Sequence, residues 1–234
     1  MRLALRGLGV FLVFLLVVPA HVVASLFGAK DLVPPVFLGL MGRVAGLRVR
    51  TVGQPLSGAL YLANHESWLD ILALAGRTQA VFVGHSGLAE SAFIRWLAAQ
   101  NRTVFITRHQ RGSVARQVEQ VRAALSERPV VIFPEGTTND GTGLLPFRSS
   151  LLAAVEPLAH EVPVQPVALD FKDVREVGWF GDEPGLANVL RVLARPGRVE
   201  LTIHFLPPLS GAALADRKAM TAAARAAIER VLRP

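Results

Sequence analysis

The chain has 234 residues, of which 51% are hydrophobic, and it carries a net charge of +7 with no cysteine. This length fits one domain with a small appendage. The absence of cysteine excludes disulfides, thiolate metal sites and a cysteine acyl-enzyme. The mean hydropathy of +0.40 lies above the usual level for a soluble globule. No recognised nucleic-acid motif accompanies the basic charge, so we expect no nucleic-acid partner.

Residues 1–46 are predicted to form a membrane-associated helical segment. Residues 1–50 contain six Lys or Arg against one acid, Asp31, and this bias favours an anionic membrane surface as a partner. No charged residue stands between positions 7 and 29. As a helix, this run would reach roughly 35 Å, against about 30 Å for the hydrocarbon core of a bilayer.

Three arrangements of this segment are compatible with its pattern. The basic start and apolar run fit a signal peptide, although VVAS is a poor cleavage site. The length fits a spanning helix. Pro19, the second apolar stretch at 33–47 and the arginines Arg43 and Arg48 fit a kinked helix that lies partly in one leaflet. The weak cleavage site favours a segment that is retained.

Residues 47–234 are predicted to form an α/β domain with a mixed, largely parallel sheet covered by helices. Short β-rich runs alternate with helical ones, and runs such as VVIF are apolar throughout, as in strands covered on both faces. The predicted strands are 47–52, 59–63, 80–83, 103–107, 130–133, 164–169 and 199–205. The predicted helices are 68–75, 92–99, 114–127, 149–158, 186–194 and 220–232. We expect residues 172–185 to form a surface excursion.

The stretch NHESWLD, residues 64–70, follows the predicted strand at 59–63. Strand ends are where α/β proteins place their chemistry. Ser67 and Asp70 have the spacing of a capping box, which by itself would explain Asp70. In the first turn of a helix, however, the Asp70 carboxylate leans back toward His65. It could then fix the imidazole tautomer and leave the other ring nitrogen as a base for a hydroxyl.

The attacking hydroxyl is expected to belong to a substrate. A catalytic serine would be marked by a G-x-S-x-G elbow, and the candidate GHSGL has Leu88 where the second glycine belongs. Ser67 is better placed as a helix cap than as a nucleophile.

A second cluster, FPEGTTNDGTGLLPFRSS, occupies residues 133–150. Its glycines would let main-chain N–H groups approach an oxyanion or a phosphate. It is not a P-loop, because Thr142 stands where the lysine belongs. Glu135 is either a solvated or capping acid, or a group that hydrogen-bonds a substrate hydroxyl or orients an arginine.

Two arginines flank these loops. Arg108 follows the run TVFIT, and Arg148 precedes the predicted helix at 149–158. A single arginine is usually solvated surface. Two at the ends of adjacent elements, beside a glycine-rich loop, favour the binding of an anion.

These motifs together resemble the glycerolipid acyltransferase family, whose best-known members acylate lysophosphatidic acid to phosphatidic acid. The family carries four blocks in order, which are NHESWLD, VFITR ending at Arg108, FPEGT at 133–137 and VPVQP at 162–166 in this chain. The blocks span residues 64–166 and their order fits. The basic, apolar N-terminus is also similar to the membrane-seating helices of this family.

The resemblance implies O-acylation of a lysophospholipid by an acyl thioester, with conversion of lysophosphatidic acid to phosphatidic acid as the leading expectation and without an acyl-enzyme, a metal ion or another cofactor. His65 would be the general base and Asp70 its orienting partner. Glu135, Gly136 and Thr137 would lie at the acceptor, with Arg108 toward its phosphate. We add Arg148 to the substrate-binding residues from its charge and placement.

Three departures leave the acceptor open. Many relatives have lysine near His85, arginine at the position of Thr138 and an acid at the position of Thr107. Because two of these departures remove positive charge, a lyso-ornithine lipid or another lysolipid is an alternative to lysophosphatidic acid.

The donor is acyl-carrier protein or acyl-CoA. A lysolipase or thioesterase that uses the same dyad is a further alternative, as is a lipid-binding protein without catalysis. We expect a location on the cytoplasmic face of a bacterial inner membrane.

Overall fold

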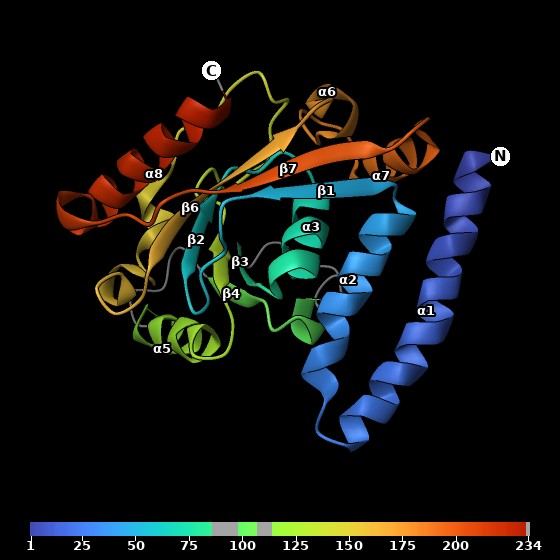
Figure 1. The fold of residues 1–234 in the computed structure, drawn as a ribbon, viewed down its shortest axis with the longest axis horizontal. Helices are drawn as coiled ribbons and strands as arrows, with labels where there is room; N and C mark the ends of the chain where they lie inside the picture. Colours follow the sequence, from blue (N-terminus) through green and yellow to red (C-terminus); the bar gives the residue numbers. More distant parts are fainter. Residues whose placement is uncertain (86–97, 107–113, 233–234) are drawn as a thin grey trace.

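The computed structural model describes residues 1–85, 98–106 and 114–232. In this part of the chain, seven strands form one sheet in the order β1-β7-β6-β2-β5-β3-β4 (Figure 1). The strands are β1 (Leu47–Val52), β2 (Leu60–Ala63), β3 (Val81–His85), β4 (Val104–Ile106), β5 (Val130–Ile132), β6 (Val164–Phe171) and β7 (Val199–Phe205). All neighbouring pairs are parallel except β6 with β7. The predicted mixed, largely parallel sheet is therefore confirmed. β1 and β7 have the predicted bounds, and the ends of the other strands differ from the prediction by at most two residues.

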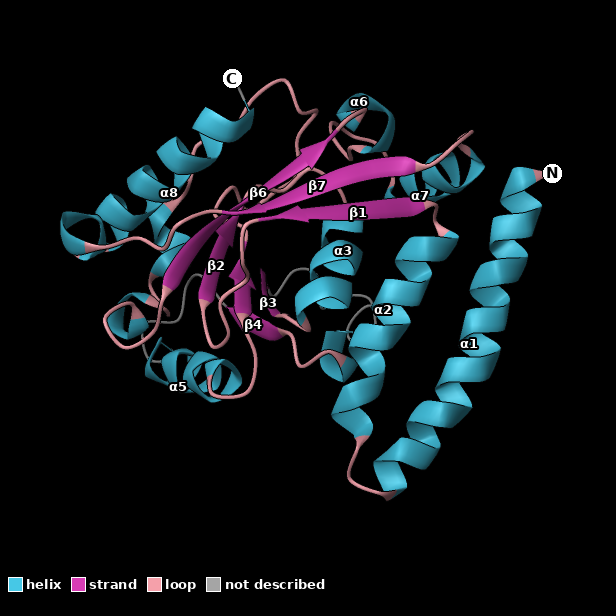
Figure 2. Cartoon of the chain, in the orientation of Figure 1, coloured by secondary structure: helices cyan, strands magenta, loops and turns pink. Residues whose placement is uncertain are grey.

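Helices cover both faces of this sheet (Figure 2). They are α1 (Arg2–Leu26), α2 (Val33–Val44), α3 (Leu69–Thr78), α5 (Val114–Leu125), α6 (Val174–Val177), α7 (Gly185–Ala194) and α8 (Arg217–Leu232). Alternate side chains of β2 enter two different cores, as the two-residue period of a strand requires. Tyr61 and Ala63 pack with α2, α3 and α7, whereas Leu60 and Leu62 pack with α5 and α8. Burial of β2 on both faces explains its uninterrupted apolar sequence.

Two predicted features differ from the structure. The helix expected at 149–158 is replaced by two 3₁₀ segments, Ser149–Leu152 and Glu156–Leu158. Pro157 lies inside the expected helix, where it has no N–H to donate and disfavours helical backbone at the preceding residue. Residues 172–185 contain α6, and the fully buried Val177, so they are not simply a surface excursion. The helix expected at 92–99 lies mostly outside the described residues.

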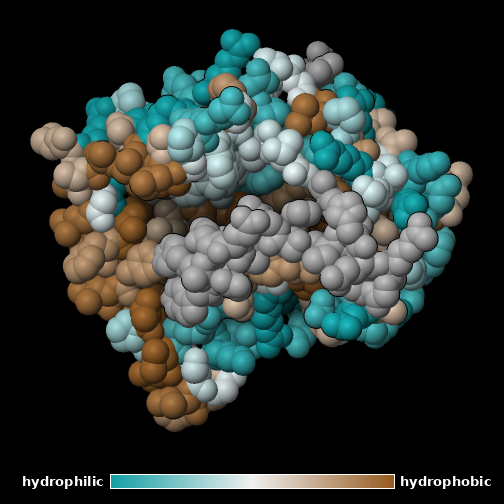
Figure 3. All heavy atoms as spheres, turned by 180° about the vertical axis from the view of Figure 1, so that it is seen from behind, coloured by the Kyte–Doolittle hydropathy of each residue, from teal (hydrophilic) through white to brown (hydrophobic). Residues whose placement is uncertain are grey.

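The N-terminal helix α1 is continuous from Arg2 to Leu26, with Pro19 inside it. It is the helix in the described chain that is long and apolar enough to cross a membrane. Its inner face packs on α2, where Phe14 meets Phe37 edge to face, and its outer face leaves apolar side chains exposed. Apolar side chains gather along this edge of the molecule (Figure 3).

Polar contacts join both ends of the α1–α2 pair to the rest of the fold. The Arg6 guanidinium donates to the main-chain oxygens of Val192, Leu193, Arg195 and Gly197 at distances of 2.8–3.2 Å, which caps the C-terminal end of α7. Near the turn of the pair, Arg102 forms an ion pair with Asp31, and Arg128 donates to the Asp31 main-chain oxygen. The helix pair is thus fastened to the domain and does not extend freely from it.

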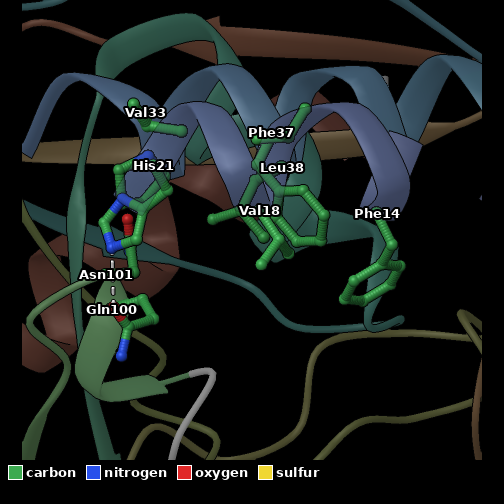
Figure 4. A pocket seen from close by; sticks show the side chains of 10 residues that line it. Phe14, Val18, His21, Val33, Phe37, Leu38, Gln100 and Asn101 are labelled. Atoms are coloured by element: carbon green, nitrogen blue, oxygen red, sulfur yellow. Dashed lines mark hydrogen bonds between the residues drawn. The ribbon is translucent and has the colours of Figure 1, made fainter. Parts of the chain in front are cut away.

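A small apolar cavity of about 50 Å³ lies between α1 and α2 (Figure 4). Phe14, Val18, Phe37 and Leu38 line it, and His21 closes one end with a 3.0 Å hydrogen bond between its Nε2 and Gln100 Oε1. This contact gives His21 a packing role, since the ring joins α1 to the chain just before β4.

The crossing of α2 and α3 depends on two glycines. A Cβ atom added at Gly76 would lie 2.7 Å from the Cα atom of Gly39, so the two helix backbones touch there. We predict that Gly76→Ala lowers the free energy of unfolding by about 1–3 kcal/mol, because the helices must separate. Chemical denaturation in detergent measures this. Gly7→Ala in α1, where a Cβ meets open space, is the matched control and should not destabilise. Equal effects of the two substitutions would contradict a packing origin.

Candidate functional site

The candidate site lies at the carboxyl ends of the parallel strands β2, β5 and β6. Because parallel strands end at the same edge of a sheet, the segments after Ala63, Ile132 and Phe171 meet there. The predicted NHESWLD and FPEGT motifs occupy the first two segments. Motifs 70 residues apart are therefore neighbours in space.

His65 and Asp70 form the predicted pair. Asp70 Oδ2 lies 2.8 Å from His65 Nδ1 and also accepts the main-chain N–H groups of Glu66, at 2.8 Å, and Ser67, at 3.0 Å. The two main-chain N–H groups can only donate, and an ionised carboxylate can only accept. With Asp70 ionised, Nδ1 therefore donates its hydrogen to Oδ2, and in the neutral ring Nε2 keeps its lone pair. The carboxylate is completely buried, whereas the imidazole keeps 18% of its surface exposed.

The His65 ring is held from a second side by an aromatic stack. It lies nearly parallel to the Phe133 ring, with 4.0 Å between ring centroids, and Phe82 continues the stack behind Phe133. His65 Nε2 has no hydrogen-bond partner among the described residues. A neutral imidazole with one fixed nitrogen and one available nitrogen has the arrangement of a general base.

The predicted capping box is half correct. The reach of Asp70 back to the Ser67 N–H is present, and α3 begins at Leu69. Ser67 Oγ instead donates to the Val177 main-chain oxygen at 2.9 Å, and its contact with the Leu69 N–H is long, at 3.4 Å. The buried serine thus ties the loop before α3 to α6. Its burial leaves it unsuited to nucleophilic attack.

Glu135 joins the two motif loops through its carboxylate. Oε1 accepts the His65 main-chain N–H at 2.9 Å, and Oε2 accepts the Asn139 amide at 2.8 Å and the Leu145 N–H at 2.9 Å. The side chain is only 1% exposed, and burial raises its pKa. These contacts position the backbone of His65 from inside the protein. A contact between Glu135 and substrate stays a prediction.

The remaining predicted residues lie around this centre. Gly136 and Thr137 are exposed at the surface of the loop, and Gly136 adopts a positive φ of 72° that turns the chain after the motif. Arg148 is exposed, and its guanidinium makes no hydrogen bond or ion pair with the described part of the chain. Its main-chain N–H donates to Pro134 at 2.8 Å, so it stays beside the loop. Arg108 lies outside the described residues.

Sequence reasoning missed the role of Asn64. Its amide exchanges hydrogen bonds with the main chain of Leu169, at 2.7 and 2.9 Å, and thereby fastens the loop after β2 to β6. Asn64 is completely buried. An amide directly after a buried apolar strand was the available signal, because a buried amide requires fixed partners.

Glu66 is a second residue that the sequence reasoning did not assign. It is 6% exposed, and Asn64 donates to its Oε1 at 3.2 Å. Burial, together with the nearby carboxylates of Asp70 and Glu135, raises its pKa from 4.5 to about 8. Glu66 lines a cavity of about 220 Å³ that Asp170 and Glu229 also border. Among the described residues, no cluster of three or more His, Asp or Glu is arranged to hold a metal ion.

The raised pKa of Glu66 predicts that stability depends on pH. The folded protein keeps the Glu66 proton to about pH 8, whereas the unfolded chain releases it near pH 4.5, so folding weakens as pH rises through this interval. Wild type should therefore lose stability from pH 5 to pH 9 at Glu66, whereas Glu66→Gln should not. The free energy of unfolding of Glu66→Gln, compared with that of wild type, should rise by roughly 2–4 kcal/mol over this interval. Denaturant unfolding at both pH values measures this gain. Glu119→Gln, at an exposed acid, is the control, and a pH-independent difference would contradict the assignment.

Comparisons with known proteins agree with this geometry. Residues 47–170 match the model of the family described as Acyltransferase. The lyso-ornithine lipid O-acyltransferase of Rhodobacter capsulatus is 34% identical over 97% of this chain and 88% of its own length. The 1-acyl-sn-glycerol-3-phosphate acyltransferase of Neisseria gonorrhoeae is 32% identical over 59% of this chain and 54% of its own length.

A solved structure shares the fold. The crystal structure of the 1-acyl-sn-glycerophosphate acyltransferase from Thermotoga maritima aligns with a TM-score of 0.55 and 15% sequence identity, over 97% of this chain and 96% of that one. The region that matches the family model, residues 47–170, contains the His65–Asp70 pair, the FPEGT loop and the strands that bring them together. The chain therefore belongs to the acyltransferase family.

Proposed function

We propose that this protein transfers a fatty acyl group from an acyl thioester to the free hydroxyl of a lysolipid, and that this lysolipid is a lyso-ornithine lipid. The observation that carries the reaction is the His65–Asp70 pair, with Nδ1 held by a buried carboxylate and Nε2 available. Membership of the acyltransferase family supports the same chemistry.

The proposed step is direct transfer. His65 Nε2 takes the proton of the acceptor hydroxyl while the hydroxyl oxygen attacks the thioester carbonyl carbon. The tetrahedral intermediate collapses by cleavage of the carbon–sulfur bond. The departing sulfur receives the proton from Nε2, which yields an ester, a free thiol and the original imidazole. Asp70 stabilises the imidazolium that forms between the two proton transfers.

The order of similarity among the relatives favours lyso-ornithine lipid as the acceptor. Four proteins named lyso-ornithine lipid O-acyltransferase are 30–34% identical over 79–97% of this chain. The Neisseria and Haemophilus 1-acyl-sn-glycerol-3-phosphate acyltransferases are 26–32% identical over 59–70% of it. The comparisons thus support both acceptors that the sequence left open. The matches to lyso-ornithine lipid O-acyltransferases cover more of the chain.

Charges around the site also favour a head group that carries an amine. Asp170 borders the cavity beside the site, and Thr138 donates to the Trp179 main-chain oxygen where a positive charge would suit a phosphate. An ornithine head group offers an ammonium to the Asp170 carboxylate. It also offers a carboxylate, for which the predicted Arg108 and Arg148, whose guanidinium has no partner in the described part of the chain, are suitable partners.

Lysophosphatidic acid is the second candidate acceptor. Arg148 at the end of the glycine-rich loop favours it, because its guanidinium has no partner in the described part of the chain and a guanidinium binds phosphate as well as carboxylate. Acyl-carrier protein and acyl-CoA are the proposed donors, both acidic and thus suited to a chain of net charge +7. The exposed apolar face of α1 supports a membrane-associated enzyme, and we propose the cytoplasmic face of a bacterial inner membrane.

The acceptor is tested by competition. Purified protein receives labelled acyl thioester and a mixture of lyso-ornithine lipid and lysophosphatidic acid in detergent micelles, and the two products are separated. We expect lyso-ornithine lipid to be acylated preferentially. A preference for lysophosphatidic acid would overturn the acceptor assignment and keep the transferase assignment. Release of free fatty acid without either product would indicate a hydrolase.

The base is tested at His65. His65→Ala should lower the turnover number by roughly 10²–10⁴-fold, because proton removal from the hydroxyl is lost. The acylation rate at saturating substrate measures this, with circular dichroism as a check of folding. His160→Ala, at an exposed histidine far along the chain, is the matched control and should retain activity. Full activity in a folded His65→Ala protein is incompatible with the proposed base.

A further inference from the structure

A basic groove lies between α2, α3 and the edge strand β1, away from the candidate site. It has a volume of about 440 Å³. Its arginines are Arg43, Arg48, Arg77 and Arg198, and its glycines are Gly39, Gly42, Gly46 and Gly76. We use the name basic groove for this set of residues. Helix α3 begins beside the His65–Asp70 pair and ends in the groove, so roughly 10 Å of helix separates Asp70 from Arg77.

Among the described residues, no Asp or Glu lines the basic groove. The side chains of Arg43, Arg48 and Arg198 form no hydrogen bond or ion pair within the described part of the chain. Arg77 donates to the Val49 main-chain oxygen at 2.6 Å, which holds its guanidinium at the edge of the sheet without compensating its charge.

The shape of the groove follows from its glycines. Gly39 and Gly76 bring α2 and α3 into backbone contact at its floor, and no side chain from these positions fills the space. A hollow of this size that several donors line has the character of a ligand site. Planar guanidinium groups suit an oxygen-rich anion, to which they can donate two parallel hydrogen bonds.

An exposed apolar stripe leads along α2 into the groove. Leu32 and Val36 are 64% and 59% exposed. Positions 32, 36, 39 and 43 follow one another at intervals of three or four residues, so they lie on one face of the helix. Val36 lies about 10 Å from Arg43 along the axis. An amphiphile whose tail lay on the stripe would thus present its head group to the arginines.

We propose that the basic groove binds the head-group phosphate of an anionic phospholipid of the surrounding bilayer. The phosphate oxygens accept hydrogen bonds from Arg43 and Arg198, and one acyl chain lies along Leu32 and Val36. Basic pockets beside membrane-associated helices bind anionic head groups in this way. The lipid is a bound component and not a reactant, because α3 separates it from the dyad. The proposal is independent of which lysolipid is acylated.

The test compares two double variants with wild type. The full-length protein is mixed with phosphatidylcholine vesicles with and without phosphatidylglycerol, and the ratio of the two partition coefficients is measured by flotation. Arg43→Gln with Arg198→Gln should lower this ratio by roughly 30-fold, the contribution of two arginines at an anionic surface. Arg43→Lys with Arg198→Lys retains the charge but loses the planar fork, so the ratio should still fall several-fold.

The control removes the same charge elsewhere. Lys218→Gln with Arg230→Gln alters two exposed cations of α8, on the opposite side of the sheet, and should keep the wild-type ratio (Figure 1). An equal loss in this control, or full retention in the double lysine variant, would show diffuse attraction instead of a site and overturn the proposal. The acylation rate in detergent should stay at the wild-type level in all three variants, since none alters the dyad.

A soluble probe identifies the source of the phosphate. Calorimetry with dihexanoyl phosphatidylglycerol below its micelle concentration should give saturable binding with one lipid per protein, absent in the double glutamine variant. Coenzyme A should not displace the lipid. Displacement by coenzyme A, with a raised KM for the acyl thioester in the variant, would assign the groove to the donor and overturn the proposal.

Discussion

Asp70 Oδ2 accepts three hydrogen bonds in a place that no water reaches, and the reacting end of the sheet is organised around it. Two of the donors are main-chain N–H groups of the loop before α3, so the same oxygen that selects the His65 tautomer also fixes the path of that loop. These hydrogen bonds therefore link the first turn of α3, the loop and the His65 ring. Preorganisation of this kind is what a general base requires, because the proton must leave along one defined direction.

Three carboxylic acids, Asp70, Glu66 and Glu135, share this small buried region. Their hydrogen bonds differ, and the second oxygen of Asp70, Oδ1, is buried without a partner among the described residues. Asp70 takes N–H donors from its own loop, Glu135 takes donors from two loops, and Glu66 retains its proton because burial and the other two acids disfavour its charge. Neighbouring carboxylates repel one another, and hydrogen bonds hold the groups in place against this repulsion. Acids with pKa values shifted in this way cluster at functional sites.

The α1–α2 pair connects the exposed apolar face of α1 with the α/β domain. Arg6 caps α7 through four main-chain oxygens, the contact of Gly39 with Gly76 sets α2 directly on α3, and α3 carries Asp70. A continuous series of contacts therefore runs from α1 to the His65–Asp70 pair. A lysolipid acceptor whose tail stays in the bilayer would have its hydroxyl presented at a fixed height above the membrane. Binding energy from the tail could then contribute to orientation at the reacting centre.

The sequence by itself determined the features that arise from local spacing. The alternation of apolar runs indicated the seven strands, and the five-residue separation of His65 and Asp70 was enough to predict their contact, because one loop and one helical turn connect them. Only the tertiary structure decided contacts between distant segments. The strand order that places β2 between β5 and β6 brings Glu135 to the His65 N–H across 70 residues, and it buries Glu66. The basic groove likewise combines positions 43, 77 and 198, which share no local pattern. Short apolar strands of three or four residues carry too little information to fix their neighbours, so the packing of the whole sheet makes that choice.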